Sequence, residues 1–177
     1  MRSRDAFTYA EVGGTRRDDL LVRPPRGYRP IDRRARIGDG AAAWHAAADA
    51  VLRWGIQRRS GIRVAAADRD LAAGDAAILR IGRWPRDVPC RVVYVIDEPD
   101  VRGFAYGTLR GHPERGEEVF LVERDPDGSV WVHVRAFSRP ASWFFWAAYP
   151  LVRLMQHRYT ERYLRALACD PPAGARR

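Results

Sequence analysis

Residues 103–123 read GFAYGTLRGHPERGEEVFLVE, two apolar runs on either side of a turn. The first run covers 104–109 and the second covers 119–122. Between them, Gly111-His112-Pro113 combines glycine and proline in the manner typical of turns. The pattern therefore predicts two antiparallel strands joined through this turn.

Short apolar runs bounded by turn residues also occur on both sides of this stretch. They predict strands at 62–66, 76–81, 90–96 and 130–137. A first strand is predicted at 28–37, where apolar and charged residues alternate as they do when one side of a strand faces water.

Two helices are predicted from the spacing of apolar residues. The first follows strand 28–37, because Asp39 suits an N-cap, apolar residues recur at helical spacing from Trp44 onwards, and Gly61 supplies a stop. The second begins near Pro150 and stacks apolar side chains three to four residues apart as far as Leu167.

This order of elements has one economical packing, an α+β domain in which a curved antiparallel sheet wraps around a long C-terminal helix. We call this a helix-grip arrangement. It is expected to span residues 27–169. Residues 1–26 are expected to form a leader packed on the domain, and residues 170–177 a disordered tail.

Several motifs point to a family. The pieces are FTY at 7–9, VGGT at 12–15, PRGY at 25–28, AFSRP at 136–140, and the block 103–123 itself. With them the chain resembles the uncharacterised family known as domain of unknown function 1990, or uncharacterised protein family 0548. The predicted fold also resembles the START and Bet v 1-like superfamily. That resemblance implies an apolar cavity between the sheet and the terminal helix, and it carries over no activity.

Length and composition indicate one globular domain, because 177 residues suffice to bury a substantial core. The amino terminus is polar, so no signal peptide is predicted. The longest apolar stretch, 141–152, is interrupted and shorter than the about 20 residues that a membrane helix needs. Cys90 and Cys169 do not suggest a disulfide framework. A cytoplasmic protein is expected.

The net charge of +9 has two interpretations. A nucleic acid or an anionic surface is the partner that such a charge suggests. However, all 31 basic residues other than histidine are arginines, there is no lysine, and they are spread along the chain. We favour a solvated arginine surface and keep a nucleic-acid or protein partner as an alternative.

The turn region also carries candidate chemistry, in His112, Glu114, Glu117 and Glu118. A histidine with carboxylates could hold a metal or act as acid and base. The same residues could equally form a solvated hairpin loop, which is the interpretation we prefer, and we predict neither a metal nor another cofactor. His112 and Glu118 remain candidate proton shuttles for a cyclase- or hydrolase-like enzyme.

Strand 130–137 presents two different faces. One is small and aliphatic, and the other carries Trp131, His133, Arg135 and Phe137. His133 and Arg135 would anchor a ligand if this face looked into a cavity, and would be surface residues if it faced water. The aromatic cluster at 143–146 could be a lid, a membrane contact or core.

The function predicted from these observations is non-covalent binding of an apolar or amphipathic small molecule under the terminal helix. An enzyme in the same cavity is the alternative. The residues expected to line the cavity, with His133 and Arg135 as possible polar contacts, are Tyr94, Phe104, Tyr106, Phe120, Met155 and Tyr159.

Overall fold

The structure, a computed structural model, describes residues 6–82, 86–143 and 149–168, with the backbone alone at 149–155. The predicted tail at 170–177 and most of the aromatic cluster, 144–146, lie outside the described residues. In chain order the elements are η1 (Gly14–Arg16), β1 (Arg29–Asp39), α1 (Gly40–Val51), α2 (Gly55–Arg59), β2 (Ile62–Ala65), β3 (Ala76–Ile81), β4 (Val88–Asp97), β5 (Val101–Thr108), β6 (Glu114–Arg124), β7 (Ser129–Pro140) and α4 (Tyr149–Arg165). Within the described parts of the chain, no helix has the length and hydropathy needed to cross a membrane.

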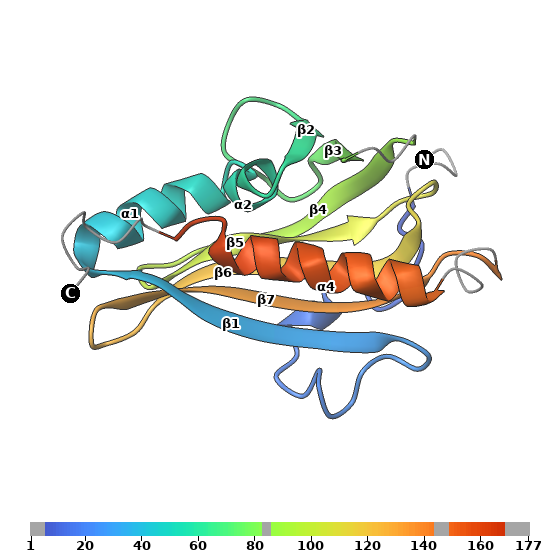
Figure 1. Ribbon diagram of the computed structural model, residues 1–177, viewed down its shortest axis with the longest axis horizontal. Helices are drawn as coiled ribbons and strands as arrows, with labels where there is room; N and C mark the ends of the chain where they lie inside the picture. The colour runs from blue at the N-terminus through green and yellow to red at the C-terminus, as the bar shows by residue number, and fades with distance from the viewer. Residues whose placement is uncertain (1–5, 83–85, 144–148, 169–177) are drawn as a thin grey trace.

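All seven strands form one antiparallel sheet in the order β1-β7-β6-β5-β4-β3-β2. From β2 to β7 each strand pairs with its neighbour in the chain, and β1 pairs with β7, so the first strand lies beside the last. Figure 1 shows that the sheet curves into a half-barrel. The predicted α+β class and the curved antiparallel sheet are thus confirmed.

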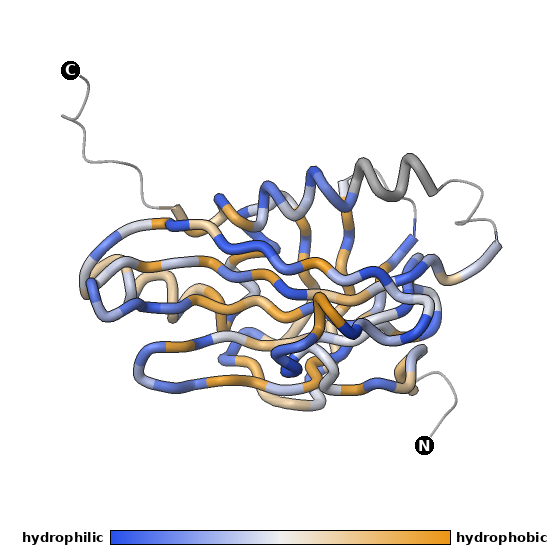
Figure 2. Tube along the Cα trace, turned by 90° about the horizontal axis from the view of Figure 1, so that it is seen from below, coloured by the Kyte–Doolittle hydropathy of each residue, from blue (hydrophilic) through white to orange (hydrophobic). Residues whose placement is uncertain are grey.

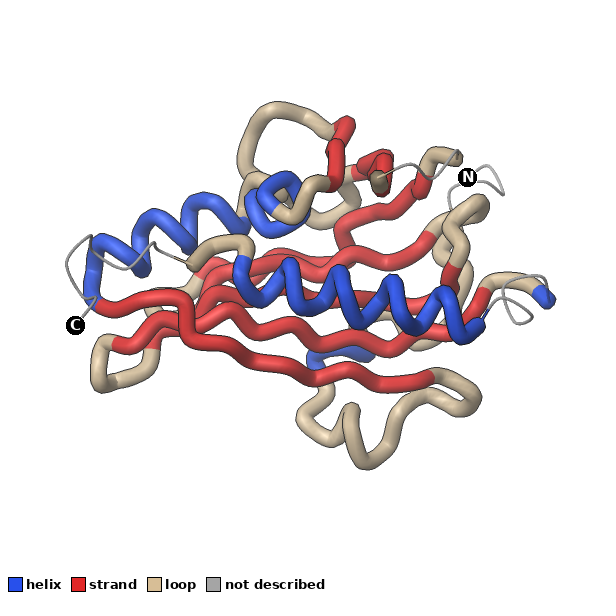
Figure 3. The backbone as a smooth tube through the Cα atoms, viewed as in Figure 1, coloured by secondary structure: helices blue, strands red, loops and turns tan. Residues whose placement is uncertain are grey.

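Helices α1, α2 and α4 lie on one side of the sheet, which we call the inner face (Figures 1 and 3). Its core joins Val130, Val132 and Val134 of β7 to apolar side chains of the helices, such as Trp44 and Leu164. The three valines are fully buried, as expected where one face of an alternating strand packs beneath helices. Figure 2 shows α4 above the sheet and the N-terminal segment below it, with apolar and polar residues alternating along the strands.

The opposite, outer face is covered by the segment that precedes β1. The backbone of Thr8 donates to the Thr108 carbonyl at 3.0 Å, which ties this segment to the end of β5. Tyr9, Leu20 and Tyr28 then pack with Phe137 of β7. The sheet is therefore buried on both faces over much of β5 to β7.

The single helix predicted between Asp39 and Gly61 is in fact two helices, α1 and α2. Trp54, at the N-cap of α2, has φ of 61°, a left-handed conformation that a bulky residue rarely adopts. A Cβ atom on Gly55 would lie 2.4 Å from the Ala50 carbonyl oxygen, so only glycine allows the chain to turn this closely against α1. The break places α2 at the edge of the inner face.

Candidate functional site

Two glutamates of β6 lie on the inner face, beneath α4. Glu118 is directly opposite Tyr106 of β5, and Glu114 is four residues earlier on the same side of the strand. Gly116 lies between them with φ of 150°, and a Cβ atom there would be 1.9 Å from the Phe137 carbonyl oxygen. Glycine therefore lets β6 remain paired with β7 through this region.

Each glutamate has one hydrogen-bond donor among the described side chains. The Tyr106 hydroxyl donates to Glu118 Oε2 at 2.7 Å. Gln156 of α4 donates from its amide nitrogen to Glu114 Oε1 and also, at 3.0 Å, to Ser138 Oγ. These contacts connect three strands to the terminal helix through polar groups.

Burial strongly favours the neutral forms of both acids. It raises the pKa of Glu118 to about 7, against the hydrogen bond from Tyr106, which lowers the pKa. Burial and then the negative charge of Glu118 raise the pKa of Glu114 to about 8. Burial also raises the pKa of the Tyr106 and Tyr163 hydroxyls, and the charge of Glu118 adds to this effect. The pair can therefore release or accept protons near neutral pH.

His112, the other predicted catalytic residue, has a different setting. The Glu114 backbone N–H donates to its Nδ1 at 3.0 Å, so the ring closes the turn between β5 and β6. Burial lowers the pKa of His112 to about 4. A neutral imidazole that accepts a backbone hydrogen bond has one nitrogen occupied, and no direct bond joins it to the Glu118 carboxyl among the described contacts.

Three of the predicted lining residues meet in one aromatic cluster on the inner face. The Phe120 ring lies 5.9 Å from Phe104 and 5.8 Å from Tyr106, measured between ring centroids. Tyr163 of α4 meets Phe120 edge to face at 5.1 Å, and Trp54 meets Phe104 at 4.7 Å. These rings fill space against one another, and Phe104 and Phe120 are fully buried.

Two further lining candidates belong to α4. Tyr159 is partly buried, with its ring centroid 6.2 Å from that of Tyr163, so it lies beside the aromatic cluster. The side chain of Met155 lies outside the described residues. Tyr163 was not among the predicted lining residues, although its place one turn after Tyr159 on the same helix face is a signal that could have identified it.

Tyr94 was predicted to share a cavity with Phe104, Tyr106 and Phe120, but it lies on the outer face. The pairing of β4 with β5 shifts between Val92 and Tyr94, so a β-bulge reverses which residues face inward. The Tyr94 hydroxyl is 2.7 Å from Thr15 Oγ1 in the N-terminal segment. The face of Tyr94 could not be predicted because a bulge leaves no clear mark in the sequence.

His133 and Arg135 also lie on the outer face of the sheet. His133 is hydrogen-bonded to Glu123 at 2.9 Å and to Asp32 at 2.7 Å. Burial lowers the pKa of His133, but these two carboxylates outweigh it and raise the pKa above its usual value. Arg135 pairs with Asp32 at 3.1 Å. Both residues thus take part in a charged, partly buried network on the face away from α4.

The possible metal cluster around the turn is divided between the two faces. Glu117 points outward, opposite to Glu118, and it accepts hydrogen bonds from the N-terminal segment. In the described part of the chain, no three His, Cys, Asp or Glu side chains gather as metal ligands would. Cys90 is buried and its Sγ lies 3.7 Å from the Ala77 carbonyl oxygen, and burial raises the pKa of its thiol.

Glu114, which the sequence suggested for a loop, proves to be part of the inner-face pair, and Gln156 was not predicted at all. Once β6 is known to begin at Glu114, residues 114, 118 and 120 have the same parity and therefore share a face. The sequence placed this strand at 119–122, because charged residues ordinarily end an apolar run.

Solved structures with a similar arrangement confirm the fold. A norcoclaurine synthase of Thalictrum flavum, in a point mutant bound to a transition-state analogue, superposes with a TM-score of 0.51 over 79% of this chain and 94% of that one, at 10% identity. A hypothetical protein of Helicobacter pylori gives a TM-score of 0.51 over 93% of this chain and 97% of that one, at 12% identity. At such low identities these likenesses describe the fold alone.

Sequence comparisons give closer relatives. A protein of Deinococcus radiodurans named UPF0548 protein is 39% identical over 180 residues, which cover 94% of this chain and 88% of that protein. A UPF0548 protein of Dictyostelium discoideum is 25% identical over 89% of this chain and 82% of its own length. The family profile described as domain of unknown function (DUF1990) matches residues 8–166. The chain therefore belongs to the DUF1990 family.

Proposed function

We propose that this protein binds a small apolar or amphipathic molecule between the inner face of the sheet and α4, in a helix-grip arrangement. The observation that carries the proposal is the pair of carboxyl groups, Glu114 and Glu118, set beneath the helix beside an aromatic cluster. A few polar groups among aromatic side chains are typical of small-molecule sites.

The charge balance indicates which ligand groups would suit the pair. Among the described residues, no arginine or histidine forms an ion pair with Glu114 or Glu118. A ligand that supplies hydrogen-bond donors, such as a hydroxyl or an amine, would provide the missing partner. The rings of Tyr106 and Tyr163, which each retain a small exposed fraction, would border its apolar part, and a cation would be favoured by aromatic faces.

An enzyme in the same place is the second candidate, and one contact favours it. The Tyr106 hydroxyl lies 2.7 Å from Glu118 Oε2, and the pKa of Glu118 is near 7. A general acid or base works best when its pKa lies near the working pH. Glu118 would then exchange a proton with a substrate, and Tyr106 would hold its carboxyl group in place, as in a cyclase- or hydrolase-like reaction.

A nucleic-acid role has less support from the arrangement of charges. Many arginines of the described chain already face carboxylates, for example Arg17 with Asp19 at 2.9 Å and Arg34 with Glu123 at 2.8 Å. Such pairs are typical of a solvated surface. Binding that weakens on the order of a thousandfold between low and moderate salt would be needed to restore this alternative.

Native mass spectrometry of protein purified without denaturant tests the binding proposal. We expect a discrete extra mass that disappears on denaturation. The fraction of protein that carries this mass should fall in Glu118→Gln. It should be unchanged in Glu98→Gln, because Glu98 is exposed in the turn between β4 and β5. If the wild-type protein shows the mass of the polypeptide alone, the result would contradict the proposal of a retained ligand and would favour the enzyme.

A further inference from the structure

Three polar side chains around α2 are buried and carry atoms with no hydrogen-bond partner among the described residues. They are Trp54, Gln57 and Ser60, with 1%, 0% and 5% of their surface exposed. The unpartnered atoms are Trp54 Nε1, both amide atoms of Gln57, and Ser60 Oγ. Leaving a buried polar group unpaired costs about 1–3 kcal/mol, so three such residues together call for a binding partner.

The three residues lie three positions apart in a row along the chain, with Trp54 at the N-cap of α2, Gln57 within the helix and Ser60 at its C-cap. The Trp54 ring packs against Phe104 and Tyr106, which places this end of the row at the aromatic cluster. Ser60, at the other end, lines a cleft between α2 and α4. Ser60 is thus the member of the row that lines the cleft, and Gln57 and Trp54 are buried beyond it, with Trp54 in a left-handed backbone conformation.

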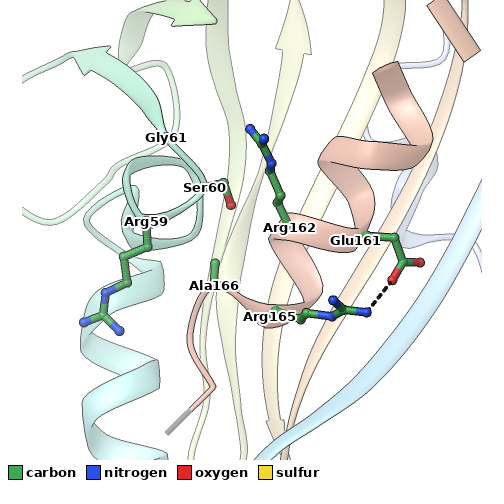
Figure 4. Close-up of a pocket in the computed structure, with 7 residues that line it drawn as sticks. All are labelled: Arg59, Ser60, Gly61, Glu161, Arg162, Arg165 and Ala166. Carbon is green, nitrogen blue, oxygen red and sulfur yellow. Dashed lines mark ion pairs between the residues drawn. The ribbon is translucent and has the colours of Figure 1, made fainter. Parts of the chain in front are cut away.

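The cleft has a volume of about 530 Å³, which is in the range of small-molecule sites. Its lining contains three basic residues, Arg59, Arg162 and Arg165, and one acidic residue, Glu161. Figure 4 shows that Arg162 and Ser60 extend into the gap between α2 and α4, whereas Arg59 turns away and Arg165 turns toward Glu161.

Arg162 carries a charge that its described neighbours do not neutralise. Glu161 is paired with Arg33 at 2.8 Å and with Arg165 at 3.5 Å. The described contact of Arg162 is with the Tyr159 ring, 5.3 Å from its centroid. Arginines in the last turn of a helix also complement the helix dipole, but that role does not explain the unpartnered atoms of α2.

We propose that this cleft is a second binding site, which takes the anionic oxygen group of a small hydroxylated molecule. Arg162 and Ser60 would bind a phosphate or carboxylate in the cleft, and a ligand that extends inward past Ser60 would place further oxygens near the buried N–H groups of Gln57 and Trp54. Gln57 Oε1 is an acceptor, so it requires a hydroxyl on the ligand. The site lies at the C-terminal end of α4, whereas Glu114 contacts Gln156 in the middle of that helix, and it does not depend on the proposed function.

The sequence offers a direct way to observe this site. The chain contains two glutamines, Gln57 and Gln156, and no asparagine. A ¹⁵N spectrum of the whole protein should therefore show two side-chain NH₂ pairs, one in the cleft row and the other beside Glu114. The variants Gln57→Leu and Gln156→Leu assign them, and Trp54→Phe assigns the indole signal.

The experiment titrates labelled protein with sodium phosphate and with sodium lactate, using sodium chloride at equal ionic strength as the reference. We expect one of the two anions to shift the Gln57 pair and the Trp54 indole signal saturably while the Gln156 pair stays in place. Arg162→Ala should weaken this binding about tenfold or more, because it removes a charge-assisted hydrogen bond. The matched control is Arg158→Ala, one turn earlier on α4 and exposed, which should leave the affinity unchanged.

A parallel arm separates a soluble ligand from a lipid headgroup. Co-sedimentation with phosphatidylcholine vesicles that contain phosphatidic acid, lost in Arg162→Ala and retained in Arg158→Ala, would assign the site to a lipid phosphate. The proposal is overturned if neither anion shifts the Gln57 pair beyond the chloride reference and the vesicles do not bind. It is also overturned if both arginine variants respond alike.

Discussion

Glu117 and Glu118 are consecutive residues of β6 with opposite surroundings. Glu117 faces outward and accepts hydrogen bonds from the Tyr9 hydroxyl at 2.7 Å, the Gly13 N–H at 2.7 Å, and the N–H and hydroxyl of Thr15 at 3.0 and 2.5 Å. Glu118 faces inward and has one described donor, Tyr106.

This difference shows that the carboxyl group of Glu117, and not that of Glu118, has a structural role. Four donors compensate the burial of Glu117, and they fasten the N-terminal segment to the sheet. The single donor of Glu118 does not compensate its burial, and its pKa rises to about 7. A carboxyl group that the fold leaves incompletely paired is the one available to a ligand or a substrate.

The largest expected effect comes from removing the structural carboxylate. Glu117→Ala should lower the free energy of unfolding by about 3 kcal/mol, because it leaves the donors of Tyr9, Gly13 and Thr15 buried without an acceptor. Glu118→Gln should change it by less than about 1 kcal/mol at pH 7, because an amide can replace a partly neutral carboxyl group. Urea denaturation measures the unfolding free energy of both variants. Equal losses of stability would contradict the distinction between Glu117 and Glu118.

The next effect concerns pH. The pKa of Glu118 is raised from 4.5 to about 7 in the folded protein, so the stabilisation from its protonated form is complete below pH 4.5 and is lost as pH rises through 7. Between pH 5 and pH 8, the wild type should lose about 2 kcal/mol of unfolding free energy relative to Glu118→Gln. The comparison with the variant cancels the titration of groups that are not coupled to Glu118, whereas the titration of Glu114 changes with it. A difference that stays constant with pH would show that Glu118 titrates normally.

A smaller effect is expected at the one donor to Glu118. Tyr106→Phe keeps the ring in its cluster but removes the hydroxyl, which should cost about 1 kcal/mol of unfolding free energy. The hydrogen bond from Tyr106 lowers the pKa of Glu118, so its loss should raise that pKa further. Carboxyl ¹³C signals followed with pH measure the change. A lower pKa in Tyr106→Phe would mean that the hydroxyl does not act on this carboxyl.

Much of the fold could be predicted from the sequence because apolar runs and turn residues mark strands locally. Strand β3 was predicted at 76–81 and is observed there. Strand β6 was predicted too short, because its polar half is covered by α4 on one face and by the N-terminal segment on the other. This burial results from tertiary packing, which local sequence patterns do not predict.

The site was harder to predict than the fold for the same reason. The block 103–123 contains Tyr106, Glu118 and Phe120. These residues lie on the two neighbouring strands β5 and β6, where Tyr106 is opposite Glu118. Tyr94 was assigned to the wrong face because of the bulge beside Val93. Gln156 contacts Glu114 across 42 positions of sequence, and only the packing of α4 on the sheet brings them together.

The most direct test of the central claim is a carboxyl ¹³C titration of the wild-type protein, with signals assigned through Glu114→Gln and Glu118→Gln. The account predicts that both inner-face glutamates titrate near neutral pH, Glu118 near 7 and Glu114 near 8. Glu118→Gln should lower the pKa of Glu114, because the negative charge of Glu118 contributes to raising it. Midpoints near 4.5 for both residues would contradict the claim that β6 presents an incompletely paired acid site beneath α4.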